Sequence, residues 1–264
     1  MSINITGKTP LSEEIVPEPL RWLRFLPRLS LITALGAITL PIAFLAGLGQ
    51  QASDQALGPE FVEMLQAVRS PGLFRLAWGI DAVIWFMLGA ILIALAGILH
   101  HHAPIRARFI AVCGTTQILG ALGSFLRLDA ISDIASRYIL ASPDQQVELL
   151  SSYLDLWRVI NSSNHMAVLF QGIGFFLVSW GLYSLRGFPR WLAIWFALPG
   201  LLAITQFGIF ITGAEYLFAL NVLGLITGNI ALNLAIAITI WQPPKLLISS
   251  LQASMPGKGQ DNDG

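Results

Sequence analysis

Five polar or ionisable side chains lie inside apolar stretches of the sequence, where they could bind a solute or an ion. They are Asp81, Arg127, Asn164, His165 and Gln206. Exposing such a side chain to lipid is unfavourable, so each must face another helix or line a hydrated space. In the first interpretation these side chains hold the helices together, since a hydrogen bond between membrane helices contributes about 0.6 kcal/mol. The second interpretation is a polar vestibule that binds a ligand, and the sequence leaves both interpretations open.

Asp81 and Arg127 could also form an ion pair. The short turn at 103–108 makes the two helices that carry them antiparallel neighbours, and both residues lie near the same membrane boundary. A charge-assisted hydrogen bond between them is therefore geometrically available. The alternative is that Asp81 caps the start of its helix while Arg127 reaches lipid headgroups.

The sequence has no pattern that is typical of an enzyme, a metal site or a cofactor. It contains no Gly-rich phosphate loop, no nucleophile elbow and no CxxC motif. His100, His101 and His102 are consecutive, so their side chains point in different directions and cannot converge on one metal ion from one helix face. We therefore assign no catalytic residue, no metal and no cofactor, and we favour a protein that is not an enzyme.

The composition indicates an integral membrane protein. The mean hydropathy is +0.69, and only 11% of the residues are charged, against about 25% in soluble domains. The formal net charge is zero and the basic residues are scattered, which gives no footprint for nucleic acid. The partner expected from composition alone is the lipid bilayer.

Six apolar runs are long enough to cross a bilayer. We predict an all-α bundle of six transmembrane helices, with a membrane domain over 20–242 between tails at 1–19 and 243–264. Amphipathic patterns at 61–68 and in two parts of 129–162 predict further helices in the outer loops, over the mouth of the bundle or on the lipid surface. The predicted spans are 29–49, 78–99, 109–128, 164–185, 191–212 and 216–241.

Basic residues set the predicted orientation. With both termini in the cytoplasm, ten of the 15 Lys and Arg residues lie on the cytoplasmic side, among them Arg186 and Arg190 in the turn between the fourth and fifth spans. This topology places the five polar residues in the outer third of their helices. The expected location is the inner (plasma) membrane of a bacterium.

Small residues predict where helices pack closely. Gly120 belongs to a ridge of small residues on the third span, and Gly224 and Gly228 have GxxxG spacing on the sixth. Asn229 and Asn233 lie one turn apart on that same helix and should avoid lipid. We therefore expect the sixth span to be the most enclosed helix.

The fifth span opens with Pro189, Arg190, Trp191 and Leu192. With this sequence the chain resembles a family of bacterial six-helix integral membrane proteins that is known only as a domain of unknown function. The resemblance covers about residues 20–242 and implies the six-helix fold without an activity.

Two functional classes are favoured by these observations. The first is a protein that binds or moves a small solute through an outward-facing polar vestibule. The second is a membrane scaffold whose outer amphipathic helices hold a membrane-protein partner.

Overall fold

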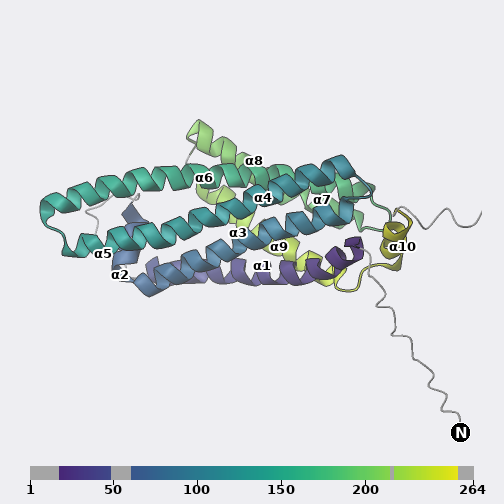
Figure 1. Ribbon diagram of the computed structural model, residues 1–264, viewed down its shortest axis with the longest axis horizontal. Coiled ribbons are helices and arrows are strands. Elements are labelled where there is room, and N and C mark those ends of the chain that lie inside the picture. Colours follow the sequence, from purple (N-terminus) through teal and green to yellow (C-terminus); the bar gives the residue numbers. More distant parts are fainter. Residues whose placement is uncertain (1–17, 49–60, 215–216, 255–264) are drawn as a thin grey trace, which may run out of the picture.

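The computed structural model describes residues 18–48, 61–214 and 217–254, and within these ranges the chain is built of α-helices and one π-helical turn, η2 (Figure 1). The elements are α1 (Glu18–Leu48), α2 (Val62–Arg69), α3 (Pro71–Leu99), α4 (Pro104–Leu126), η2 (Arg127–Ile131), α5 (Ser132–Leu140), α6 (Pro143–Ser184), α7 (Arg190–Trp195), α8 (Ala197–Thr212), α9 (Phe218–Ile240) and α10 (Lys245–Ala253).

Six helical stretches are long and apolar enough to cross a membrane, which confirms the predicted all-α, six-helix fold. They are α1, α3, the run from α4 to α5, α6, the run from α7 to α8, and α9. The helices form a closed ring in which the order of packing is α3, α4, α6, α8, α9, α1 and α3 again. The protein is therefore an integral membrane protein whose helices surround a central axis.

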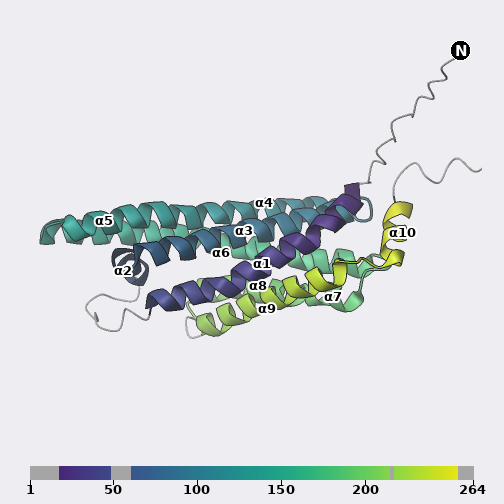
Figure 2. The same cartoon turned by 90° about the horizontal axis from the view of Figure 1, so that it is seen from below.

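The two ends of the ring differ. At one end, which we call the α10 end, α10 and the start of α1 lie together (Figures 1 and 2). At the other, the α5 end, the helical hairpin of α5 and α6 extends beyond the other helices (Figure 1). In the predicted orientation the α10 end is cytoplasmic and the α5 end is outside.

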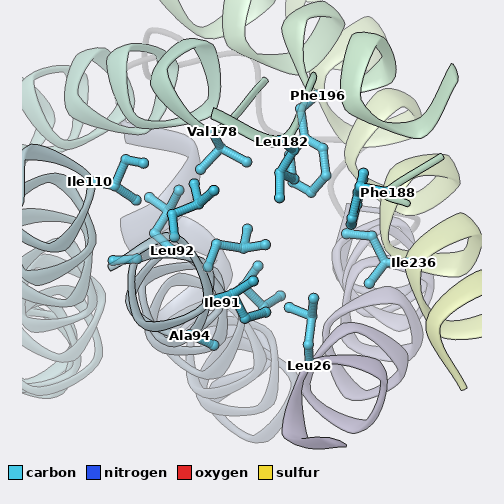
Figure 3. Packing of buried hydrophobic residues seen from close by; sticks show 14 of the residues in the cluster. Leu26, Ile91, Leu92, Ala94, Ile110, Val178, Leu182, Phe188, Phe196 and Ile236 are labelled. Atoms are coloured by element: carbon cyan, nitrogen blue, oxygen red, sulfur yellow. The ribbon is translucent and has the colours of Figure 1, made fainter. Parts of the chain in front are cut away.

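A continuous apolar core fills the half of the ring nearest α10. Figure 3 shows side chains from α1, α3, α4, α6 and α9 converging on it, with Phe188 from the turn after α6 and Phe196 from the junction of α7 and α8. Leu247 and Leu251 of α10 are also buried in this core. The α10 end is therefore closed by tight packing.

The prediction that the loop after the third span carries surface helices is wrong in its geometry. The helix that starts at Pro143 does not lie on the membrane but continues through the fourth span as α6, which has 42 residues. At 1.5 Å per residue such a helix is about 63 Å long, roughly twice the thickness of a hydrocarbon core. It begins as expected, with Pro143 in its first turn and the Ser142 amide donating to Gln145 Oε1 at 3.0 Å.

The extension at the α5 end has its own small core. There α2 packs against α5, and Phe61, Met64, Ile134, Leu149 and Tyr153 are buried together. The chain passes from α4 through η2 into α5 without a break, so this hairpin is an extension of two spanning helices. The α2 helix is held inside the protein by this cluster and does not lie on the lipid surface.

Helix packing also differs from the prediction for the sixth span. In the apolar window of α3, 56% of the residues are buried, against 39% for α9, so α3 is the more enclosed helix. A Cβ at Gly224 would lie 3.5 Å from Leu202, an ordinary contact, and one at Gly228 would lie 3.8 Å away. The tight crossing predicted at this pair is absent. A close approach occurs instead between α3 and α4, where a Cβ at Gly89 would lie 2.6 Å from Gly114 O.

Candidate functional site

A cavity of about 460 Å³ lies inside the ring, in the half towards the α5 end. Its walls come from α1, α3, η2, α6, α8 and α9. The structure brings together all five polar residues that the sequence singles out, because each of them lines this cavity: Asp81, Arg127, Asn164, His165 and Gln206. Most of the remaining wall is apolar, with Ile84, Leu88, Val168, Leu225 and Ile226 among the lining residues.

Two hydrogen bonds hold the Asp81 carboxylate in place. Ser124 Oγ on α4 donates to Asp81 Oδ2 at 2.6 Å, and Trp85 Nε1, one turn further along α3, donates to the same oxygen at 3.1 Å. Asp81 lies ten residues after the start of α3, so it does not cap that helix. Both donors are neutral, so neither of them balances a negative charge on this carboxylate.

Arg127 forms a different ion pair from the one predicted. Its Nε lies 3.8 Å from Glu63 Oε2 on α2, and no ion pair within 4 Å joins it to Asp81. Arg127 Nη2 also donates to Asn161 Oδ1 at 3.5 Å, and its guanidinium lies 4.5 Å from the centre of the Trp78 ring. With 6% of its surface exposed, Arg127 does not reach lipid headgroups either. The correction follows from α2, which packs Glu63 against Arg127.

The position of Arg127 coincides with a local irregularity. It is the first residue of η2, the π-helical turn between α4 and α5. A π-turn adds a residue to a helical turn and thereby changes the direction of the side chains that follow. Such turns occur frequently at functional sites, and no feature of the sequence predicted this one.

Glu63 is partly buried beside Arg127 and lies outside the spanning helices. Burial raises the pKa of Glu63 above its ordinary value of 4.5, and the positive charge of Arg127 opposes this rise. The Glu63 carboxylate is therefore stabilised chiefly by Arg127, and the two residues should depend on each other.

Three further side chains line the cavity. His165 is held in place by its contacts, whereas Asn164 and Gln206 each have an acceptor oxygen without a donor in the described part of the chain. His165 Nδ1 donates to the Asn161 carbonyl at 2.7 Å, and its ring stacks on Phe210 of α8 with 4.0 Å between the ring centres. Asn164 Oδ1 and Gln206 Oε1 are buried acceptors that receive no hydrogen bond from the described residues. Such acceptors are typical of sites that hold water or a ligand.

The deeper amides have a structural use. Gln117 Nε2 donates to Gln171 Oε1 and Gln171 Nε2 to Asn229 Oδ1, each at 3.4 Å, so that one chain of amides links α4, α6 and α9. Asn229 and Asn233 are both buried, and each donates to a backbone carbonyl one turn earlier on α9. Asn229 and Gln171 also line the cavity, at its side towards the apolar core.

Sequence reasoning missed several residues of the site, namely Glu63, Ser124 as a donor, Trp78 and Trp85. The most direct signal for Trp85 and Ser124 was their spacing. Trp85 is four residues after Asp81, and Ser124 is one turn before Arg127. No comparable signal exists for Glu63, because α2 is separated from Arg127 by more than one spanning helix in the sequence.

Gly120 of α4 leaves room for the Trp85 ring, which donates a hydrogen bond to Asp81. A Cβ at Gly120 would lie 2.7 Å from the Trp85 ring and 3.0 Å from Ala167 Cβ. We expect Gly120→Ala to lower the free energy of unfolding by about 1–3 kcal/mol, because the added methyl must displace the ring that holds Asp81. The measurement is thermal unfolding in a mild detergent. The matched control is Gly208→Ala on α8, where a Cβ meets nothing within 4 Å. Equal stability of the two variants would contradict the expected clash.

Comparison with known proteins supports the family resemblance seen in the sequence. The sequence of residues 31–242 matches the family DUF4386, described as a domain of unknown function. No significant match was found among curated proteins or among solved structures. Since the matched stretch covers most of the chain and all six spanning helices contribute to it, the protein belongs to the family of the domain of unknown function DUF4386.

Proposed function

We propose that the protein binds a small solute in the cavity of the ring and moves it through the inner (plasma) membrane of a bacterium. The observation that carries this proposal is the convergence of the five polar residues, from α3, η2, α6 and α8, on one cavity of about 460 Å³. Sites that bind small molecules are typically cavities of this size, with a few polar groups in a mainly apolar wall.

The unmet hydrogen-bonding capacity of the cavity wall supports the same proposal. A buried polar atom without a hydrogen bond costs about 1–3 kcal/mol. Asn164 Oδ1 and Gln206 Oε1 receive no hydrogen bond from the described residues, and both residues line the cavity. Two such acceptors on residues that line one cavity support a site that is completed by a polar group of a solute, or by water in its place.

The closed half of the ring supports movement of the solute by rearrangement of helices. The apolar core lies between the cavity and the α10 end, with Leu92, Leu95 and Phe196 fully buried in it. A solute can therefore leave the cavity towards α10 only after the helices around the apolar core have separated. In the predicted topology, the resting protein accepts its solute from outside.

A wall substitution tests this proposal. Ile226 of α9 lines the cavity, and Ile238 of the same helix is 78% exposed on the outside of the ring. We expect solutes that raise the unfolding temperature of the wild type to lose their effect in Ile226→Trp, because the indole occupies the cavity, and to keep it in Ile238→Trp. The screen uses purified protein in a mild detergent, and uptake into proteoliposomes follows for each active solute. Solutes that act equally on both variants do not bind in the cavity, and that result would overturn the proposal.

The scaffold function remains the second candidate because of the α5–α6 hairpin. Ile139, Leu140 and Val147 at its tip are exposed by 58%, 88% and 69%. Exposed apolar side chains beyond the membrane are typical of a protein contact. If this function is the correct one, a defined membrane protein should co-purify with the wild type and be lost from Leu140→Glu, with no dependence on Ile226.

A further inference from the structure

The charges around the cavity do not balance. Arg127 carries the positive charge, and its nearest carboxylate is Glu63 at 3.8 Å. Asp81 carries a second negative charge and attracts Arg127 only from beyond 4 Å. His165 from α6 is the remaining titratable group in the lining, and its Nδ1 already donates to a backbone carbonyl. With His165 neutral and both carboxyl groups ionised, the formal charges of the described groups leave one negative charge, and it lies on Asp81.

One oxygen of Asp81 is available to a ligand. Both Ser124 and Trp85 donate to Oδ2, and none of the described residues donates to Oδ1. The two donors fix the plane of the carboxylate, and Asp81 lines the cavity. A fixed carboxylate with one unshared oxygen in a site of low dielectric constant favours a positively charged partner.

The surroundings of Asp81 suit an organic cation better than a metal ion. Trp78 and Trp85 line the cavity three residues before and four residues after Asp81, on the same face of α3. Aromatic rings attract cations through the electrostatics of their faces. The Trp78 ring already has the guanidinium of Arg127 4.5 Å from its centre, so Trp85 is the one of the two rings that is not paired with a side-chain cation of the described residues. Beyond them the wall includes aliphatic side chains such as Ile84, Leu88 and Val222, and the described residues contain no group of three His, Cys, Asp or Glu side chains that could hold a metal ion.

We propose that the solute is a monovalent organic cation with an apolar body, bound with its ammonium group at Asp81 Oδ1. This inference rests on the proposed function, since it names the class of solute for the same cavity. The ammonium group balances the charge of Asp81. The apolar body lies along the aliphatic wall towards Val168 and Leu225, and Arg127 keeps Glu63 as its partner.

Three probes of equal length and different charge test the inference. Hexylammonium, hexanol and hexanoate are added to the full-length protein in a neutral mild detergent at pH 7, and the unfolding temperature is measured against probe concentration. We expect hexylammonium to act at a concentration about tenfold lower than hexanol, because one charge pair is added in a site of reduced dielectric constant. Hexanoate should act more weakly than hexanol.

Asp81→Asn should remove this preference, so that hexylammonium and hexanol act at similar concentrations. The matched control is Asp133→Asn on α5, which removes the same charge from a side chain that is 64% exposed and does not line the cavity. The preference for the cation should persist there. Loss of the preference in Asp133→Asn as well would show a general surface-charge effect and would overturn the inference.

The outcomes separate this inference from the proposed function. Equal action of hexylammonium and hexanol on the wild type, or stronger action of hexanoate, overturns the cation class while a cavity that binds solutes still stands. If no probe acts and Ile226→Trp responds to solutes as Ile238→Trp does, both proposals fail. Should Asp81→Asn not fold, the ranking of the three probes on the wild type decides the inference by itself.

Discussion

Replacing Arg127 by Gln should lower the free energy of unfolding by about 3 kcal/mol, at the lower end of the range for one partner of a buried ion pair. The substitution removes the ion pair with Glu63, the hydrogen bond to Asn161 and the contact with the Trp78 ring. It also leaves the Glu63 carboxylate without a positive charge nearby. We place the loss at the lower end because the ion pair is long, at 3.8 Å, and the Glu63 side chain is 21% exposed.

A double-mutant cycle identifies the partner of Arg127. Glu63→Gln combined with Arg127→Gln should lower the free energy of unfolding by at least about 1 kcal/mol less than the sum of the two single substitutions. The reason is that each single substitution leaves the other residue's charge without its partner. Asp81→Asn combined with Arg127→Gln should show a smaller coupling, since Asp81 is held by neutral donors. A larger coupling for Asp81 than for Glu63 would mean that the ion pair predicted from the sequence forms after all.

The loss in Arg127→Gln should also depend on pH. Burial raises the pKa of Glu63, and removal of Arg127 takes away the largest effect that opposes this rise, so that only a hydrogen bond from Trp157 still opposes it. Between 4.5 and the raised pKa, the folded protein then binds more protons than the unfolded chain, so stability falls as the pH rises through this window. The cost of Arg127→Gln should therefore be smaller at pH 5 than at pH 8. In a Glu63→Gln background this difference should disappear, and its persistence would assign the pH dependence to another group.

The spanning helices were predictable because their signal is local. A run of about 20 apolar residues can be recognised without knowing its neighbours. The same is true of Asp81, Gln206 and the other polar residues of the cavity, since a polar side chain within such a run must avoid lipid whatever the packing. Their assembly around one cavity follows from the ring, in which helices α3, α6 and α8 turn these faces inward.

Contacts that depend on distant packing were not predictable in the same way. Glu63 meets Arg127 only because α2 folds into the hairpin of α5 and α6, and nothing near Arg127 in the sequence signals α2. The glycine pair at 224 and 228 has the spacing of a tight crossing, but its neighbour is the long side chain of Leu202. The spacing of glycines shows which face of a helix carries small residues. Whether another helix packs closely against that face depends on the side chains of the partner helix.

The length of α6 shows a third kind of error. Polar residues after Pro143 were interpreted as a separate surface helix because hydropathy falls there. Helix continuity, however, depends on the absence of breakers, and no Pro or Gly occurs between Pro143 and Gly172. The polar part of α6 therefore continues the apolar part out of the membrane.

The second large effect is expected at Gly187, in the turn between α6 and α7. Its φ is +85°, in the region that favours glycine, and a Cβ there would lie 2.5 Å from Leu247 N and 2.6 Å from Leu246 C, both in the backbone of α10. Backbone atoms cannot move aside as a flexible side chain can. Gly187→Ala should therefore push α10 away from the apolar core, in which Leu247 and Leu251 are buried.

We expect Gly187→Ala to cost about 3 kcal/mol, of which about 1 kcal/mol is backbone strain and the rest is lost packing of α10. Gly213→Ala is the matched control, because Gly213 has a φ of +68° and a Cβ there meets nothing within 4 Å. It should cost the strain alone.

A single thiol on α10 reports the displacement directly. In a Cys113→Ser background, which removes the one native cysteine, Leu251→Cys places a thiol where the native side chain is fully buried. Its reaction with a maleimide should become faster when Gly187→Ala is added and should not change with Gly213→Ala. The rates could instead be equal in the Leu251→Cys protein and in its Gly187→Ala and Gly213→Ala derivatives. That result would mean that the buried leucines alone hold α10 in place and that Gly187 is needed only for the backbone conformation of the turn. A faster rate confined to Gly187→Ala would mean that the contact between this turn and α10 keeps the α10 end closed.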